Sequence, residues 1–410
     1  MEPSVNPSLI GAVKVPDGSV DPFRLCASNV FDAKIHGAKV LVYSEVIEFI
    51  KEQDTIKGVK VLDHHTGIVT DYYAPVTVNA GGIWGHHIAQ MAGANISMFP
   101  AKGALLIFAH RVNNVVINRC RKPANADILV PGDTVCVIGT TSTRVPYEEC
   151  DHLKVTPDEV DLLLTEGAKL APCLAETRVL RAYAGVRPLV SADNDPSGRN
   201  ISRGIVCLDH ETRDGIKGFI SITGGKLMTY RLMGEMAADA VCKKLGRDAK
   251  CVTADTPLPG SEPGGIEEIS KKIWEVPTMV QKASVGRFGT QAANLDFDGD
   301  VKGSLVCECE EVSVSEVDSA IENLEVNNLV DLRRRTRFGM GTCQGELCAC
   351  RAAGRLAKAR KCTTKARADL KDFMDERWKG MYPVAWGETL RESAYTQWVY
   401  SEVMGLGEEI

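Results

Sequence analysis

The chain has 410 residues, a hydrophobic fraction of 44%, a charged fraction of 25% and a formal net charge of -6 at pH 7. These values are typical of an ordinary soluble globular protein with about two or three domains. The acidic balance lacks the basic footprint of a nucleic-acid-binding protein. No apolar run approaches the roughly 18 residues of a membrane-spanning helix, and the first residues lack the basic and apolar regions of a secretion signal.

Residues 1 to about 255 combine β-branched runs with helical patterns, which favours an α/β domain. Strand-like runs occur at residues 40–43, 76–78 and 134–138, and residues 58–67 have the pattern of a β-hairpin. We therefore expect several short strands in this part of the chain, interrupted by helices.

Two helices of this part have clear start signals. Thr156, Pro157 and Glu159 stand in the order of an N-cap, a first-turn proline and a capping-box acid. A second helix is expected over about residues 227–245, because a double glycine precedes it and Gly246 follows it.

Prolines and glycines crowd residues 257–265, which is typical of a linker between domains. Helical patterns resume at residues 266–276, 314–324 and 329–335. The last forty residues carry three of the five tryptophans, so the chain is expected to end in an aromatic-rich segment.

Four cysteines form the most informative pattern. Cys307 and Cys309 are separated by one residue, and Cys343 and Cys348 by four. Thiolates at these spacings in short turns can face one point, which metal ligation requires and core packing does not. The spacing alone leaves three possibilities open: a [2Fe–2S] cluster, a structural zinc, or ordinary reduced thiols.

A double glycine, Gly224 and Gly225, opens the second helix and is followed by Lys226. Glycines let the backbone approach a planar ligand, and a helix start offers N–H groups with a partial positive charge. Such an end would stabilise the negative edge of a reduced flavin. The alternative is a strand-to-helix turn with a solvated lysine.

Arginine side chains supply a second candidate site. Arg187 and Arg203 lie sixteen residues apart, and two guanidinium groups can hold one phosphate or carboxylate. Isolated arginines are more often surface groups. Small residues after the strand at 76–78 offer backbone against which a cofactor could lie.

In their order, these motifs resemble the FAD-dependent glycerol-3-phosphate dehydrogenases, and most closely the A-type subunits of the anaerobic three-subunit bacterial enzymes. The resemblance covers essentially the whole chain. It rests on VPDGSVDP at 15–22, VNAG at 78–81, IGTT at 138–141, RPL at 187–189, ISR at 201–203 and GGKLMTYR at 224–231. The cysteines resemble those of the small helical [2Fe–2S] domain of bacterioferritin-associated ferredoxin, although the C-x4-C pair is longer than the C-x2-C of some members.

The resemblance implies an α/β (α+β) FAD-dependent oxidoreductase domain of the glycine/D-amino-acid oxidase type, followed by a small all-α [2Fe–2S] domain. The sequence is expected to start downstream of the Gly-rich βαβ unit that holds the FAD pyrophosphate in the family. The expected parts are an FAD and substrate domain at 1–255, a linker with a connecting helix at 256–303, the [2Fe–2S] domain at 304–360 and an aromatic-rich extension at 361–410.

The resemblance also implies the site residues. Arg187 and Arg203 are expected to bind the substrate phosphate, with Lys226 beside the flavin and the substrate. The expected FAD-lining residues are Gly224, Gly225, Leu227, Met228, Thr229, Ala80, Gly81 and, through its backbone near the adenine, Val46. The expected cluster ligands are Cys307, Cys309, Cys343 and Cys348, with Cys350 left as a spare thiol.

No general base is assigned. Aerobic relatives carry a histidine in a K-G-S-H stretch, which here reads Lys102-Gly103-Ala104-Leu105.

The implied function is the oxidation of sn-glycerol 3-phosphate to dihydroxyacetone phosphate in anaerobic glycerol catabolism. Electrons would pass through FAD and the cluster to two partner subunits, one membrane-associated, and then to a quinone. The chain would lie in the cytoplasm, at the periphery of the inner membrane. Two alternatives remain: a non-catalytic fragment that serves in electron transfer or assembly, and a flavin oxidase of an amino or hydroxy acid, since arginine also binds carboxylates.

Overall fold

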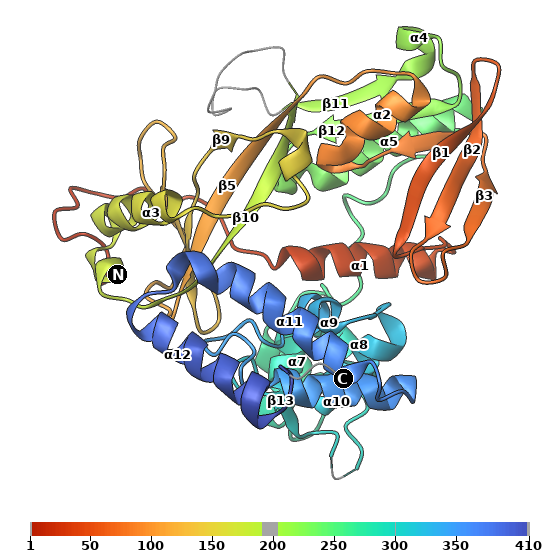
Figure 1. Cartoon of the computed structure of the whole chain (residues 1–410). Helices are drawn as coiled ribbons and strands as arrows, with labels where there is room; N and C mark the ends of the chain where they lie inside the picture. Colours follow the sequence, from red (N-terminus) through yellow and green to blue (C-terminus); the bar gives the residue numbers. More distant parts are fainter. Residues whose placement is uncertain (1, 191–203, 300, 408–410) are drawn as a thin grey trace.

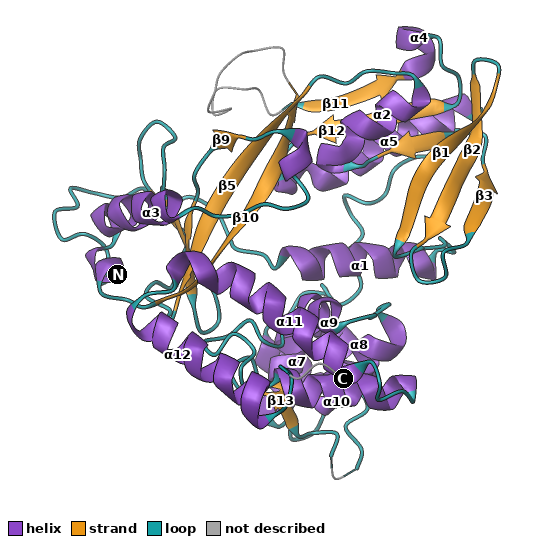
Figure 2. Cartoon of the chain, viewed as in Figure 1, coloured by secondary structure: helices purple, strands orange, loops and turns teal. Residues whose placement is uncertain are grey.

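The computed structural model describes residues 2–190, 204–299 and 301–407 (Figure 1). Strands gather in the first part of the chain, and the part after residue 265 is mostly helical (Figure 2). The α/β part and the helical part expected from the sequence are therefore both present.

One small sheet has the strand order β11-β12-β4. β12 (Phe219–Gly224) pairs antiparallel with β11 (Ile205–Asp209) and parallel with β4 (Thr77–Asn79). Because β4 and β12 run in the same direction, the residues after both strands emerge at the same edge of the sheet. The helix α5 (Tyr230–Lys244) follows β12 through one short helical turn, η4 (Leu227–Thr229).

A larger antiparallel sheet has the order β10-β5-β8-β7-β6, with β9 paired to β5. Its two long strands, β5 (Met98–Phe108) and the edge strand β10 (Val179–Val190), cross the middle of the molecule (Figure 1). The shorter strands are β6 (Ile117–Asn118), β7 (Ile128–Pro131), β8 (Cys136–Gly139) and β9 (Thr143–Arg144).

The helix α3 (Pro157–Leu170) covers this sheet, and its buried Val160 and Leu163 share a core with Leu106 and Ile138. The capping box predicted at its start is confirmed, because the Thr156 side chain and the Glu159 carboxylate bond each other's backbone N–H.

A third sheet contains β1 (Ser44–Glu52), β2 (Thr55–Asp63) and β3 (Val69–Tyr73), all antiparallel. The hairpin predicted around residues 58–67 is confirmed. The strand predicted at residues 40–43 is wrong, because the strand begins only at Ser44. Tyr43 has a φ of 52°, outside the extended region, and its hydroxyl donates to Asp331 at 2.7 Å.

Most of the helical part packs around a core that includes Leu332, Phe338, Leu356, Phe373 and Tyr400, whereas α6 and α7 have a smaller core of their own. The segment after residue 361 therefore shares its core with the segment that carries the four cysteines. Its helices are α6 (Ile266–Ile273), α7 (Met279–Phe288), α8 (Val314–Asn323), α9 (Leu329–Thr336), α10 (Ala349–Arg360), α11 (Ala366–Met381) and α12 (Gly387–Trp398).

A short antiparallel pair, β13 (Leu305–Cys307) with β14 (Val312–Ser313), adds a strand element to the cysteine domain, for which the sequence predicted only helices. The remaining elements are α1 (Pro22–Ile35), α2 (Gly85–Ala92), α4 (His210–Asp214), short 3₁₀ turns at Gly82–Trp84, Tyr147–Glu149, Pro172–Ala175, Gly289–Asn294 and Tyr382–Val384, and a π-helical turn at Val399–Val403.

The helix α1 connects the two parts: it lies between the β1–β3 sheet and the helical body (Figure 1). Asp21, which caps α1, forms an ion pair with Arg337 at 2.8 Å. Lys34 near the other end pairs with Glu325 at 3.1 Å. These contacts join both ends of α1 to the part of the chain that carries the cysteines.

Candidate functional site

The double glycine lies where β12 ends. Gly224 and Gly225 have φ values of 75° and 68°, in the left-handed region that favours glycine. A Cβ at Gly225 would lie 2.5 Å from Met233 Sδ, and a Cβ at Gly224 would overlap the carbonyl oxygen of Gly204. The chain can make this turn with its backbone exposed only because both residues lack a side chain.

Of the N–H groups of Leu227, Met228 and Thr229 in the turn η4, only the first two remain available to a ligand. The N–H of Thr229 donates to Lys226 O at 2.9 Å, and Lys226 N–H donates to Thr229 Oγ1 at 2.9 Å. Leu227 and Met228 open the turn, so their N–H groups have no acceptor within the helix, and both residues are exposed. Because α5 continues the turn, these two groups lie at the positive end of a helix dipole.

Ala80 and Gly81 follow β4 at the same edge. The Gly81 N–H donates to Asn79 Oδ1 at 3.1 Å, and Asn79 Nδ2 donates to Gly85 O at 2.9 Å and to Ser221 Oγ at 3.2 Å. The buried Asn79 side chain thus holds the small-residue loop against β12.

This network continues inward through a histidine that sequence analysis missed. His210 is fully buried, with Nε2 2.8 Å from Ser221 Oγ and Nδ1 2.5 Å from Asp214 Oδ2. A serine, a histidine and an aspartate in this order match a nucleophilic triad, but Ser221 is buried and its hydroxyl also bonds Asn79. The arrangement supports the loop. His210 and Asp214 are four residues apart on α4, but Ser221 lies on β12, and the sequence alone does not signal that contact.

These residues fit a planar, partly anionic ring system. Two adjacent parallel strands end in glycine-containing loops, and exposed N–H groups at a helix start lie on one of them. Val46, predicted near the adenine, lies in β1, which belongs to a different sheet. Its role stays a prediction.

Arg187 lies on β10, which contacts β12. Its Nη2 donates to Thr140 Oγ1 at 2.5 Å and to Thr141 O at 3.4 Å, and Nη1 donates to Ser142 Oγ at 3.5 Å. The guanidinium also lies over Gly103 of the neighbouring strand, where a Cβ would come within 2.6 Å of Nη2. Arg203, the predicted second phosphate ligand, lies outside the described residues.

A buried ion pair supports the loop that Arg187 contacts. Lys102 Nζ lies 2.8 Å from the Glu159 carboxylate and donates to Lys154 O at 2.7 Å. Thr141 Oγ1 donates to the same carboxylate at 3.3 Å. The sequence predicts Glu159 only as a helix-capping residue, and its second role depends on the contact of α3 with β5.

The four predicted cysteine ligands come together. Cys307 ends β13 and Cys309 follows it, whereas Cys343 and Cys348 lie in the loop before α10. The Cys348 thiol hydrogen-bonds Cys307 and Cys343, and Cys343 also bonds Cys309. The contacts form a continuous series in the order Cys307, Cys348, Cys343, Cys309. Cys350 is half-buried beside it.

Two of these thiols favour the thiolate. The hydrogen bond from Cys348 lowers the pKa of Cys343 to about 5 and the pKa of Cys307 to about 7. Burial raises the pKa of Cys309, and the bonds to Cys307 and Cys343 raise the pKa of Cys348. The thiolate is the form that binds metal, so one cysteine of each sequence pair already favours the ligating form.

Within the described ranges, no three His, Cys, Asp or Glu side chains surround one point in a way that could hold a single metal ion. A [2Fe–2S] cluster does not need such a point, because each of its two irons takes two thiolates. Four neighbouring cysteine thiols therefore fit the donor set of this cluster.

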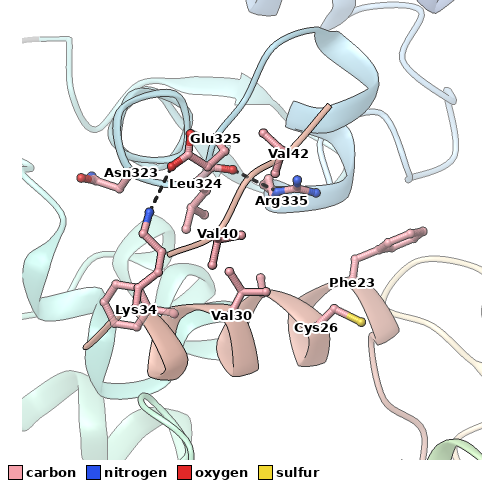
Figure 3. Close-up of a pocket in the computed structure, with 12 residues that line it drawn as sticks. Phe23, Cys26, Val30, Lys34, Val40, Val42, Asn323, Leu324, Glu325 and Arg335 are labelled. Carbon is pink, nitrogen blue, oxygen red and sulfur yellow. Dashed lines mark hydrogen bonds and ion pairs between the residues drawn. The ribbon is translucent and has the colours of Figure 1, made fainter. Parts of the chain in front are cut away.

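A pocket of about 160 Å³ lies elsewhere, between α1 and the region where α8 ends and α9 follows (Figure 3). Val30 and Val40 line it on one side and Leu324 on the other, and the Lys34–Glu325 ion pair lies at its edge. None of the predicted site residues lines this pocket, so it does not belong to the candidate site.

Comparisons with known proteins match this geometry. The model of the family described as FAD dependent oxidoreductase matches residues 1–231, and that of the BFD-like [2Fe-2S] binding domain matches residues 305–356. The A-type subunit of the anaerobic glycerol-3-phosphate dehydrogenase of Haemophilus influenzae is 58% identical over 409 residues, covering 100% of this chain and 72% of the relative. This chain belongs to the family of A-type subunits of anaerobic glycerol-3-phosphate dehydrogenase. The A-type subunit of Escherichia coli K12 is 59% identical over 411 residues, covering 100% of this chain and 76% of the relative.

A solved structure supports the fold. The FAD complex of a glycerol-3-phosphate dehydrogenase from Bacillus halodurans superposes with a TM-score of 0.67 at 22% identity, covering 89% of this chain and 74% of that one. The predicted FAD-dependent oxidoreductase fold and the predicted [2Fe–2S]-binding domain are thus confirmed, and the expected start downstream of the Gly-rich βαβ unit stays a prediction. As a member of a family of A-type subunits, the chain is one component of a multi-subunit enzyme. Residues 2–190, 204–299 and 301–407 contain no helix that is long and apolar enough to cross a membrane.

Proposed function

We propose that this chain is the subunit that oxidises sn-glycerol 3-phosphate to dihydroxyacetone phosphate. The observation that carries this proposal is the identity of 58–59%, over the whole chain, with proteins named as the A-type subunit of anaerobic glycerol-3-phosphate dehydrogenase. The arrangement of Arg187, the double-glycine turn and the four cysteines supports it.

The substrate phosphate binds at Arg187. Thr140, Thr141 and Ser142 accept hydrogen bonds from the guanidinium and fix its orientation before substrate arrives. A charge-assisted bond between arginine and phosphate fixes the substrate by the end that does not react. Arg203 is the second phosphate ligand in this proposal.

The reaction breaks the C2–H bond with both of its electrons, removes the proton of the C2 hydroxyl and forms a carbonyl. When bound, FAD supplies the two-electron acceptor and the [2Fe–2S] cluster supplies a one-electron carrier. The N–H groups of Leu227 and Met228 lie where negative charge on a flavin edge would be stabilised. Lys226 lies between them and the double glycine and has an exposed side chain.

The remaining predicted residues complete the two cofactor sites. Gly224, Gly225 and Thr229 form the turn beside the flavin, Ala80 and Gly81 pack against it, and Val46 contacts the adenine. The four thiolates of Cys307, Cys309, Cys343 and Cys348 hold the cluster. In this proposal residues 1–255 form the FAD and substrate domain, 256–303 the linker, 304–360 the cluster domain and 361–410 its C-terminal extension.

The proposed enzyme has two further subunits, one of them membrane-associated, and delivers its electrons to a quinone. This chain then lies on the cytoplasmic side and reaches the inner membrane through a partner. The designation of the relatives as A-type subunits supports partners in general, and the number of partners and the acceptor belong to the proposal.

Anaerobic turnover tests the proposal. The assembled enzyme should reduce an artificial acceptor with glycerol 3-phosphate and not with glycerol, because glycerol has no phosphate for Arg187. Arg187→Gln should abolish most of this activity, while flavin and iron contents stay at the wild-type level. Faster turnover of an amino acid or of lactate than of glycerol 3-phosphate would contradict the proposal, and so would a preparation that contains iron but never flavin.

A further inference from the structure

Three arginines are buried next to the loop that carries Cys343 and Cys348. Arg181 comes from β10, Arg333 from α9 and Arg377 from α11, and their exposed fractions are 7%, 8% and 3%. They come from three elements that are far apart in the sequence, and one of those elements, β10, belongs to the substrate-domain sheet.

Gln344, the residue after Cys343, connects two of these arginines to the cysteine loop. Its Oε1 accepts from Arg181 Nη1 at 3.4 Å and from Arg333 Nη2 at 3.2 Å. Its Nε2 donates to Gly341 O at 2.8 Å, within the same loop. Two positive charges therefore share one neutral acceptor beside a cysteine.

The hydrogen-bonding capacity of this cluster of arginines is unfilled. Arg333 Nε and both Nε and Nη2 of Arg377 are buried and have no acceptor in the described part of the chain. Among the residues that the structure describes, no carboxylate lies within ion-pair distance of Arg181, Arg333 or Arg377. A buried cation without a partner is strongly unfavourable, so a negative charge should lie near these groups.

The nearby carboxylates provide little of the negative charge that the three arginines require. Glu376 faces Arg181 and Arg333 only at longer range, and Glu392, which faces Arg377, already forms an ion pair with Arg178. Glu346 also faces Arg377 only at longer range, without an ion pair. These acids do not balance three guanidinium groups.

The cysteines also face these arginines. Arg333 interacts electrostatically with Cys348, and Arg377 with Cys343. A [2Fe–2S] cluster held by four thiolates has a net negative charge, and this charge grows by one unit when the cluster accepts an electron. Buried positive charges stabilise the reduced cluster more than the oxidised one.

We propose that Arg181, Arg333 and Arg377 are the buried counter-charges of the iron–sulfur cluster and raise its reduction potential, so that it accepts electrons from the flavin. The inference rests on the cluster being the [2Fe–2S] group of the proposed function. Because Arg181 and Arg187 lie on the same strand, the substrate-binding strand also supplies a charge to the electron acceptor.

The test is a redox titration of the full chain loaded with its cluster, followed by the electron paramagnetic resonance signal of the reduced state. Arg377→Met removes one charge and no hydrogen bond that the structure describes, so it is the cleanest variant. The expected result is an equilibrium constant for reduction at least tenfold lower, which for one electron is a potential lower by 59 mV. Arg377→Lys, which keeps the charge, should restore most of the potential.

Arg391→Gln is the matched control, because Arg391 lies on α12, is exposed, and pairs with the exposed Glu388. It should leave the potential unchanged. The cluster-free chain gives a second readout: Arg377→Met should keep or raise its melting temperature, because the buried charge then has no counter-ion.

An unchanged potential in Arg377→Met with an intact cluster signal would overturn the inference. Loss of stability in the cluster-free chain as large as in the loaded chain would also overturn it, since the arginine would then be purely structural. A chain that binds zinc and no iron overturns it as well. If the potentials shift as expected but glycerol 3-phosphate never reduces the enzyme, the counter-charge role stands and the proposed substrate fails.

Discussion

Gly103→Ala tests the placement of Arg187 without touching any group that could bind substrate. The added Cβ would lie 2.6 Å from Arg187 Nη2 and 3.0 Å from Cζ, so the guanidinium must move. The atoms that move belong to the end of a flexible side chain, and Gly103 does not have a positive φ. The fold should therefore accept alanine, with an unfolding free energy within about 1 kcal/mol of wild type.

The expected functional effect is much larger. A hydrogen bond to a charged group contributes about 1.5–3 kcal/mol, and each 1.4 kcal/mol is a factor of ten, so KM for glycerol 3-phosphate should rise roughly 10- to 100-fold. The phosphate is held equally in the ground state and the transition state, so kcat should change little. Steady-state turnover at varied glycerol 3-phosphate concentration measures both constants.

Gly185→Ala is the matched control. Gly185 pairs directly with Gly103 across β5 and β10, and a Cβ there meets no atom within 4 Å. This variant should keep the wild-type KM. If both glycine variants have the same KM, the guanidinium does not bind the phosphate from the position described.

Three further predictions concern the cluster ligands, the Glu166 carboxylate and the core of the helical part. Cys307→Ser should lose the iron and the visible absorption of the cluster, whereas Cys350→Ser should keep both, as iron analysis and absorbance will show; equal loss in both variants would contradict the ligand set. The hydrogen bond from Lys169 lowers the pKa of Glu166 to about 2 from the usual 4.5, so this carboxylate stabilises the fold at neutral pH and loses that effect as the pH falls from about 4.5 toward 2. Glu166→Gln should cost about 1 kcal/mol in urea unfolding at pH 7, and a cost that persists unchanged at pH 2 would refute this. Phe373→Ala, which removes a ring stacked on Phe338, should lower the unfolding free energy of the helical part by about 3–5 kcal/mol, and a loss below about 1 kcal/mol would show that this core is loosely packed.

Features that depend on neighbours in the sequence were predictable. The capping box of α3 needs only Thr156 and Glu159, three residues apart, and the hairpin at residues 58–67 needs only two strands and a turn. The cysteine spacing likewise placed Cys307 and Cys309 in one turn and Cys343 and Cys348 in another. Only the folded structure shows that these two turns lie next to each other.

Features that depend on contacts between distant segments were not predictable. An apolar run favoured a strand at residues 40–43, but Tyr43 turns away to bond Asp331 in the helical part. His210 and the three buried arginines carry no clear signal in the sequence, since Ser221, which His210 contacts, and Gln344, which Arg181 contacts, lie on other elements. The roles of these charged and polar side chains can be inferred only once the structure shows that they are buried and which residues they contact.

The most direct test of the proposed path from substrate to cluster is an anaerobic experiment on the assembled enzyme loaded with FAD and iron. Glycerol 3-phosphate is added in the absence of any other acceptor, and the electron paramagnetic resonance signal of the reduced [2Fe–2S] cluster is recorded with time. We predict that the signal appears with wild-type enzyme and is lost in Arg187→Gln, although dithionite still reduces the cluster of that variant. A flavin that glycerol 3-phosphate bleaches while the cluster stays oxidised would contradict this path.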